Sequence, residues 1–151
     1  MTPTLIMAGK AVYLDTSGIL GMLDAGDEFH APAAAAWNDL LDAGLEMVMT
    51  DYVRLESWSL IQRRLGLEAA EDFHQAILPL CSVRPVGETG FGFLARQAVL
   101  MKRRNLSIVD LSSFDCMRRE GLRLAFAFDA HFDEQGFLTP QSPGWVVPPE
   151  K

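Results

Sequence analysis

Short apolar runs alternate along this chain with stretches of helical periodicity, and that alternation limits the possible folds more than any other feature. Four runs have the length of buried strands, at 11–14, 45–49, 80–83 and 124–128. Six stretches between and after them predict helices, over 19–25, 29–43, 51–65, 67–78, 88–103 and 110–121. Because strands that alternate with helices pair in parallel, we predict an α/β fold with a central, mostly parallel sheet of four to five strands.

The length of 151 residues and the hydrophobic content of 49% fit one domain with its own core. We expect an N-terminal extension over 1–10, a domain over 11–138 and a Pro-rich tail over 139–151. The tail could add one edge strand at Trp145-Val146-Val147.

No apolar run approaches the roughly 20 residues that span a bilayer, and the first residues lack the pattern of a signal peptide. Cys81 and Cys116 are too few for a disulfide framework and have no Cys-x-x-Cys spacing. These features favour a cytoplasmic protein with reduced thiols and no membrane contact.

Two aspartates follow predicted strands directly, Asp15 after the first strand and Asp129 after the fourth. In an open parallel sheet, ligands bind beyond the carboxyl ends of the strands, so both side chains are candidates for one site. The alternative is structural, because an aspartate at either position would also cap a following helix well.

Glu56 shares one predicted helix face with Val53, Ser57 and Leu60. A carboxylate on a face that packs against a core must be paired or metal-bound, because removing a lone charge from water costs several kcal/mol or more. The alternatives are an ion pair with an arginine, or a stripe that is in fact exposed.

Asp110 lies where Ser107 or Asp110 itself opens a helix. An N-cap is the most common reason for an aspartate at such a place. The same position would also direct a carboxylate from the start of the helix into the cleft that Asp15 and Asp129 define.

Four carboxylates in one cleft favour Mg²⁺ or Mn²⁺, which prefer oxygen ligands. Bound ions could activate a water molecule and offset phosphate charge, which is the chemistry of phosphodiester hydrolysis. A strand followed by Asp15 also permits a receiver or a haloacid-dehalogenase-like phosphatase. However, Ser17 stands where that phosphatase needs a second aspartate, and the paired acid and late lysine of a receiver are not evident.

Four segments of the sequence together resemble the PIN-domain ribonucleases, and within them the VapC-type toxins of bacterial toxin–antitoxin pairs. The segments are 13–17, 50–56, 106–114 and 126–132, and their acids are separated by 41, 54 and 19 residues. The resemblance covers about 11–138. It implies a three-layer α/β/α fold and a Mg²⁺- or Mn²⁺-dependent endoribonuclease that cleaves single-stranded or structured RNA. It also implies a homodimer and an antitoxin that covers the cleft.

The resemblance assigns Asp15, Glu56, Asp110 and Asp129 to the metal site, with Asp15 and Asp110 as the chief ligands. The hydroxyl groups of Thr16, Ser17 and Ser112 fall where the family often places polar groups beside the metal. Two further residues are secondary candidates. Asp115 departs from the small or apolar residue expected there, and His131 could contact a phosphate or simply pack at the surface.

RNA binding needs cations, whereas the net charge of this chain is −7. The candidate contacts are basic groups near predicted helix ends: Lys102, Arg103 and Arg104; Arg118 and Arg119; Arg63 and Arg64; and Arg123. Stabilisation of the helix dipole is the favoured interpretation for most of these positions. The alternative function is a PIN-like scaffold that binds RNA or protein without turnover, because acids can be present in the sequence and yet be misplaced in the site.

Overall fold

The computed structural model describes residues 11–147. The predicted extension over 1–10 and the last four residues of the predicted tail lie outside this range. No helix within 11–147 is long and apolar enough to cross a membrane. Cys81 and Cys116 are free thiols.

The strands of this part of the chain form one parallel sheet in the order β3-β2-β1-β4. Their bounds are Ala11–Leu14 for β1, Glu46–Thr50 for β2, Cys81–Arg84 for β3 and Ala125–Phe126 for β4. The central strand β1 is apolar throughout, and each of its residues is buried, as expected for a strand covered on both faces. The predicted parallel α/β sheet is confirmed, with four strands.

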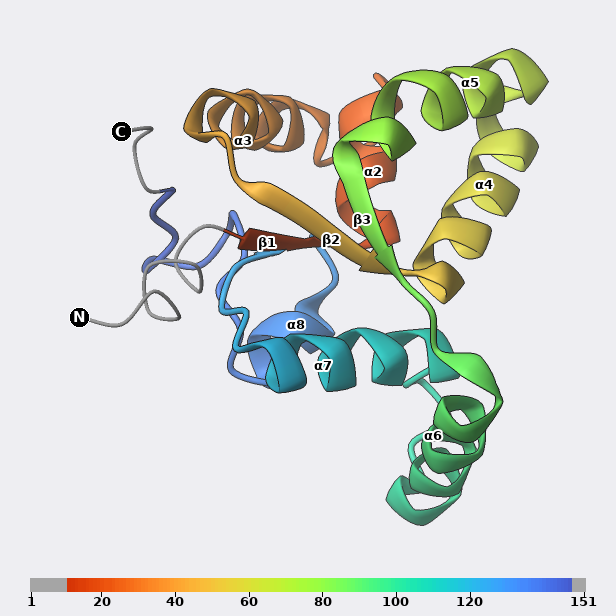
Figure 1. The fold of residues 1–151 in the computed structure, drawn as a ribbon. Coiled ribbons are helices and arrows are strands. Elements are labelled where there is room, and N and C mark those ends of the chain that lie inside the picture. The colour runs from red at the N-terminus through yellow and green to blue at the C-terminus, as the bar shows by residue number, and fades with distance from the viewer. Residues whose placement is uncertain (1–10, 148–151) are drawn as a thin grey trace.

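Helices cover both faces of the sheet, which gives three layers (Figure 1). In Figure 1, α2 and α3 lie on one side of β1, and α7 and α8 lie on the other. The bounds are α2 Thr16–Leu23, α3 His30–Ala43, α4 Asp51–Leu65, α5 Leu67–Asp72, α6 Gly87–Met101, α7 Ile108–Glu120 and α8 Ala130–Glu134.

Polar side chains cap the start of four of these helices. Asp15 caps α2, Thr50 caps α4, Ser107 caps α7 and Asp129 caps α8, each by accepting a bond from a backbone N–H of the first turn. The starts of these helices, three of which directly follow a strand, are therefore fixed locally, before tertiary packing is considered.

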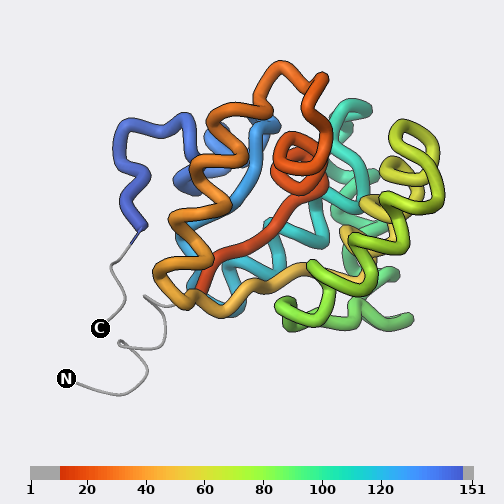
Figure 2. Tube along the Cα trace, turned by 90° about the horizontal axis from the view of Figure 1, so that it is seen from above, coloured from red at the N-terminus to blue at the C-terminus, as the bar shows by residue number. Residues whose placement is uncertain are grey.

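Aromatic rings fill the space between the helices and β4. Trp37 of α3 packs against Phe126 with ring centres 5.7 Å apart, and Phe29 stacks on Phe128 at 5.1 Å. Seen from above, α3 lies over β4 and beside β1 (Figure 2). Phe114 of α7 meets Phe132 of α8 at 5.0 Å on the opposite face. The core is thus continuous through the sheet.

The predicted edge strand at Trp145-Val146-Val147 is wrong, because these residues form no strand. Leu138 lies beside the fourth strand instead, where its backbone bonds to Arg123 and Ala125. A turn held by Ser142 follows at Thr139, and Pro140 and Pro143 have no N–H to donate to a ladder.

Two helix predictions also differ from the structure. The helix predicted over 67–78 is α-helical only to Asp72, then continues as a π-helical turn over Phe73–Ile77 and a 3₁₀ turn at Leu78–Leu80. The short helix α8 follows β4, where the sequence offered only a possible cap at Asp129.

Gly18 lies where helix α2 packs closely on strand β4. A Cβ at this position would lie 2.2 Å from the carbonyl oxygen of Phe126, a backbone atom that cannot rotate away. We expect Gly18→Ala to lower the free energy of unfolding by about 3 kcal/mol, measured by urea denaturation.

Gly92→Ala is the matched control, because a Cβ at Gly92 in α6 meets nothing within 4 Å. We expect this exposed helical substitution to raise stability by about 0.5–1 kcal/mol. Equal effects of the two substitutions would contradict the close packing of α2 on β4.

Candidate active site

The four predicted carboxylates meet at the carboxyl edge of the sheet. Asp15 directly follows β1, Glu56 lies in the helix after β2, Asp110 lies in the first turn of α7, and Asp129 precedes α8. All four line a single cavity with a volume of about 450 Å³. Residues that are far apart in sequence thus form one acidic site.

Asp15 is the most deeply buried of the four, with only 4% of its surface exposed. Its Oδ2 accepts bonds from the Ser17 N–H at 3.1 Å and the Ser17 hydroxyl at 2.6 Å. The pKa of Asp15 is raised to about 7, mainly by desolvation and to a smaller extent by the charges of Asp110 and Glu56, while the hydrogen bonds from Ser17 oppose the shift. A largely buried carboxylate is therefore held beside two others.

Glu56 lies beside the buried face of α4, which carries Val53, Ser57 and Ile61. The Ser57 hydroxyl lies 3.0 Å from that of Thr16 and so joins α4 to α2. Partial burial raises the pKa of Glu56, with smaller contributions from Asp110 and Asp129, and the Thr16 hydroxyl opposes the shift. Glu56 forms no ion pair within residues 11–147, so the arginine partner considered from the sequence is not found there.

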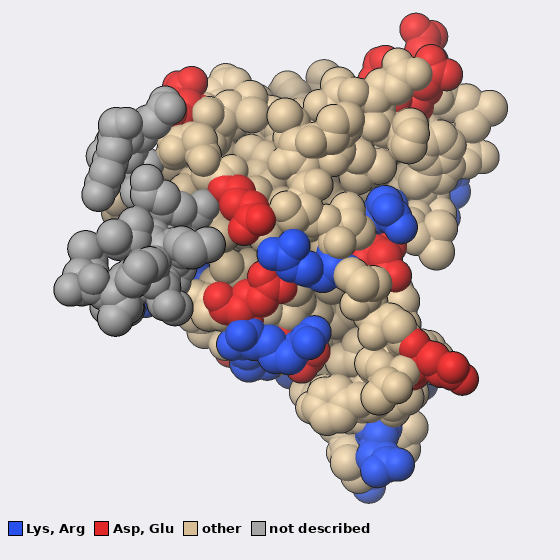
Figure 3. All heavy atoms as spheres, in the orientation of Figure 1, with Lys and Arg blue, Asp and Glu red and all other residues tan. Residues whose placement is uncertain are grey.

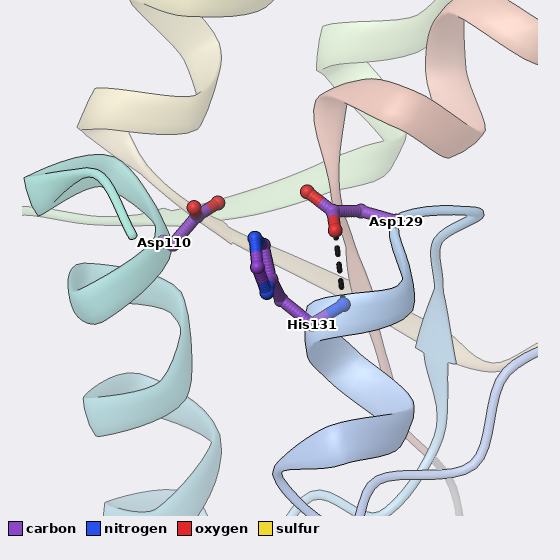
Figure 4. A group of neighbouring side chains, drawn as sticks. All are labelled: Asp110, Asp129 and His131. Atoms are coloured by element: carbon purple, nitrogen blue, oxygen red, sulfur yellow. Dashed lines mark hydrogen bonds between the residues drawn. The ribbon is translucent and has the colours of Figure 1, made fainter. Parts of the chain in front are cut away.

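Asp110 and Asp129 face each other across the cavity, with His131 beside them (Figure 4). One ligand atom from each of the three residues lies within 4.8 Å of the others. Partial burial raises the pKa of Asp110, with a smaller contribution from the charge of Asp129, while bonding from Ser107 and the nearby His131 act in the opposite direction. This geometry is compact enough for one ion to contact several side chains.

Three of the acids serve both as helix caps and as cavity residues. Asp15 uses Oδ2 to bind Ser17, Asp110 uses Oδ2 to bind the Ser107 N–H at 3.2 Å, and Asp129 uses Oδ1 to bind the His131 N–H at 2.9 Å. The second oxygen of each makes no hydrogen bond with another described residue. The capping and site interpretations are therefore compatible, because each carboxylate has two oxygens.

This donor set fits Mg²⁺ or Mn²⁺. It offers carboxylate oxygens from four residues, three of which have an oxygen that capping does not use, and His131 adds a nitrogen at the margin. None of the four carboxylates forms an ion pair in the part of the chain that the structure describes. A divalent ion would compensate their charge.

The secondary candidates divide into two groups. Thr16 and Ser17 line the acidic cavity, and the Ser17 hydroxyl also accepts a bond from the Phe128 N–H at 2.9 Å. Ser112 is buried and bonds to Thr50 and to the Val109 carbonyl, so its hydroxyl supports the first turn of α7.

Asp115 does not line the cavity. It forms an ion pair with Arg119 at 2.9 Å, one helical turn away. This placement explains why an aspartate is tolerated there: the side chain lies at the surface of α7.

Sequence reasoning missed Tyr13 and the turn before α3. The buried Tyr13 hydroxyl donates to Ser113 at 2.6 Å, which joins β1 to α7, and a polar hydroxyl inside an apolar strand was the available signal. Asp27, Glu28 and Phe29 form one rim of the cavity. Nothing in their sequence indicates this, because their position depends on how the turn between α2 and α3 folds back.

Three of the eight predicted RNA-binding cations have local partners. Arg103 pairs with Glu134, Arg119 pairs with Asp115, and Arg118 donates to Gln135 while lying over the Phe137 ring at 5.3 Å. On the face shown in Figure 3, basic side chains lie beside acidic ones instead of forming a continuous patch. These three residues, with Lys102 and Arg104, are absent from the cavity lining.

Comparison with known proteins identifies relatives across most of the chain. The sequence pattern of the PIN domain matches residues 12–138. The protein named 23S rRNA-specific endonuclease VapC20 is 35% identical over 132 residues in two strains of Mycobacterium tuberculosis, H37Rv and CDC 1551 / Oshkosh, covering 84% of this chain and 95% of VapC20.

Solved structures agree with this result. The crystal structure of M. tuberculosis VapC20, described as a sarcin–ricin loop cleaving toxin, superposes with a TM-score of 0.75 at 29% identity, covering 85% of this chain and 97% of the other. FitAcB from Neisseria gonorrhoeae superposes with a TM-score of 0.60 at 17% identity, covering 85% and 95%, and so supports the fold alone.

Because Asp15 is buried, we expect the stability of the metal-free protein to depend on pH. Below about pH 4 its carboxyl is protonated in both the folded and the unfolded chain. Between about pH 4 and pH 7 the unfolded chain loses this proton while the folded chain keeps it, so stability falls as pH rises. Asp15→Asn should therefore be more stable than the unsubstituted metal-free protein by about 2–4 kcal/mol above pH 7, and by little below pH 4.

The measurement is urea denaturation in EDTA from pH 4 to pH 8. Asp42→Asn, at an exposed aspartate of α3, controls for the loss of one charge and should show a flat difference. If Asp15→Asn proved less stable than the unsubstituted protein above pH 7, Asp15 would act mainly as a cap of α2.

Proposed function

The chain belongs to the PIN-domain family, and from this membership we propose that it is a metal-dependent endoribonuclease that acts as the toxin of a toxin–antitoxin pair. One observation carries the proposal: Asp15, Glu56, Asp110 and Asp129 converge on a single cavity with oxygens left for a divalent ion. Conversely, a scaffold without turnover has no need for a buried carboxylate that raises the cost of folding.

A structured loop of 23S ribosomal RNA is the substrate that we propose. The relatives named 23S rRNA-specific endonuclease cover 84% of this chain at 35% identity, and one solved relative is described as cleaving the sarcin–ricin loop. Ribosomal RNA is the corresponding target here, reached in the cytoplasm.

In the proposed reaction, water attacks the phosphorus atom and the bond to one ester oxygen breaks, leaving a phosphate end and a hydroxyl end. Asp15 and Asp110 would be the chief ligands of Mg²⁺ or Mn²⁺, and Glu56 and Asp129 would complete the site. The ion would supply positive charge for the attacking water and the departing oxygen.

Side chains around the site hold these carboxylates in place. The Ser17 hydroxyl links Asp15 to the backbone of Phe128, so the ends of the two neighbouring strands stay in register. The Thr16–Ser57 bond fixes the helix that carries Glu56. Such positioning favours catalysis because small displacements of reacting groups lower the rate strongly.

Protein partners are a second part of the proposal. Helix α6 projects from the body of the molecule (Figure 1), and only Leu94 on it is buried. Its exposed apolar side chains are Phe91, Phe93, Val99, Leu100 and Met101. An apolar helix surface of this kind favours a protein contact, so we propose that α6 packs against a second copy of the chain and that a separate antitoxin covers the acidic cavity.

A cleavage assay tests the nuclease. Antitoxin-free protein is incubated with an RNA that contains the sarcin–ricin loop, with tRNA and with an unstructured RNA, in Mg²⁺ or Mn²⁺. We expect cleavage of the loop that EDTA abolishes and that Asp110→Asn lowers by about 100-fold or more, because an ion ligand is lost. Asp42→Asn should cleave normally.

Cleavage that survives both EDTA and Asp110→Asn would contradict the metal-dependent mechanism. If no RNA is cleaved and calorimetry detects no binding of Mn²⁺, the scaffold function is correct instead. Cleavage of tRNA in preference to the loop would overturn the proposed substrate and leave the nuclease intact.

Light scattering tests the dimer. A charge at Leu100, which is 72% exposed, should break an apolar contact between copies, so Leu100→Glu is expected to shift the protein from dimer to monomer. Leu67→Glu is the control, because Leu67 is 65% exposed but begins α5. Dissociation by Leu67→Glu alone would place the contact elsewhere.

A further inference from the structure

One face of α4 carries both a carboxylate of the acidic site and an arginine. Glu56, Leu60 and Arg64 recur every four residues, and all three line the acidic cavity. Eight helical residues span about 12 Å along the axis, so Arg64 begins well beyond the carboxylates. Side chains in helices lean toward the N-terminus of the helix, a direction that leads from Arg64 back toward the acidic site.

The charges around the cavity make Arg64 distinctive. Six acidic side chains contribute to the lining: Asp15, Asp27, Glu28, Glu56, Asp110 and Asp129. Arg64 is the only basic residue among the described residues of that lining. An RNA strand that enters must place several phosphates near this surface, and a metal ion at the carboxylates can compensate only those closest to the cleaved bond.

The guanidinium of Arg64 is available for a phosphate. Arg64 is exposed and forms no ion pair within residues 11–147, whereas Arg103 and Arg119 are paired with acids. Arg63 and Arg64 both lie in the last turn of α4, where each complements the helix dipole. Only Arg64 of these two lines the cavity, which a dipole role does not require.

The surface between the two charged ends is apolar. Leu60 lies between Glu56 and Arg64 on α4, and Leu20 and Phe29 contribute to the same cavity. A ribose or base would contact such a wall, with one phosphate at the carboxylates and another at the arginine. This alternation of charged and apolar surface matches a nucleotide chain better than it matches an isolated anion.

We propose that Arg64 is a substrate-binding residue that holds an RNA phosphate flanking the cleaved bond. The inference rests on the proposed nuclease function and adds to it a fixed direction for the strand, which runs from the acidic site along α4. The guanidinium suits this role because it donates two parallel hydrogen bonds to phosphate oxygens.

Single-turnover cleavage and binding test the proposal together. Cleavage of the loop RNA in Mn²⁺ is compared for the unsubstituted protein, Arg64→Ala, Arg64→Lys and Arg63→Ala. We expect Arg64→Ala to raise the half-saturating protein concentration by about tenfold and to change the maximal rate by less than about twofold. Arg64→Lys should recover part of the loss, and Arg63→Ala should have a smaller effect than Arg64→Ala.

Salt dependence provides a second measurement that a purely structural role would not change. Binding of fluorescent RNA is followed in the Asp110→Asn background at several salt concentrations. Removing one phosphate contact should reduce the slope of log K against log salt by about 0.7. The same slope for Arg64→Ala and Arg63→Ala, with equal affinities, would overturn the proposal.

The outcomes separate this proposal from the one on which it rests. Cleavage by the unsubstituted protein with equal half-saturation for both alanine variants overturns only the role of Arg64. A fall in maximal rate without a change in half-saturation would likewise overturn substrate binding. If the unsubstituted protein neither cleaves nor binds RNA, the nuclease proposal itself fails and the role of Arg64 fails with it.

Discussion

A carboxylate that is almost fully buried needs compensation, and the hydrogen bonds that Asp15 receives from Ser17 connect much of the surrounding structure. The Ser17 hydroxyl donates to Asp15 and accepts from the backbone of Phe128, so one side chain joins the ends of two strands. The next strand-to-helix turn is tied to the first through Thr16 and Ser57. The geometry of the site therefore depends on short polar contacts at the end of β1.

These contacts do not remove the electrostatic cost of the site. Burial and neighbouring charges raise the pKa values of Asp15, Glu56 and Asp110, so the ionised forms are disfavoured in the metal-free protein. A cavity that concentrates like charge would bind a divalent cation strongly, because the ion would relieve the repulsion that folding created. The electrostatic cost of the metal-free site and its proposed affinity for metal would then have the same physical cause.

The sequence predicted the features that depend on local pattern. Apolar runs identified β1 to β3 closely, and the rule that ligands bind at the carboxyl edge of a parallel sheet brought Asp15 and Asp129 together. The sequence did not predict the features that depend on tertiary packing. Trp145 and Val147 pack against the core without forming a strand, and Phe29 reaches the cavity only because the α2–α3 turn folds back. From the sequence alone, a helix cap and a site residue were alternative roles for each aspartate. The structure shows that both roles are possible, because one carboxylate oxygen caps the helix and the other does not.

The acidity of the whole chain is compatible with an RNA substrate because charges act over limited distances. At physiological salt the Debye length is about 8 Å, so acids on distant helices have little influence on a strand inside the cavity. In the proposed complex, the RNA would meet the local arrangement of carboxylates, apolar wall and Arg64. In the proposed function, the carboxylates would repel RNA without an ion and attract it through one, so the metal would determine both reactivity and binding. An acidic nuclease can in this way restrict its activity to the metal-loaded state without a broad basic surface.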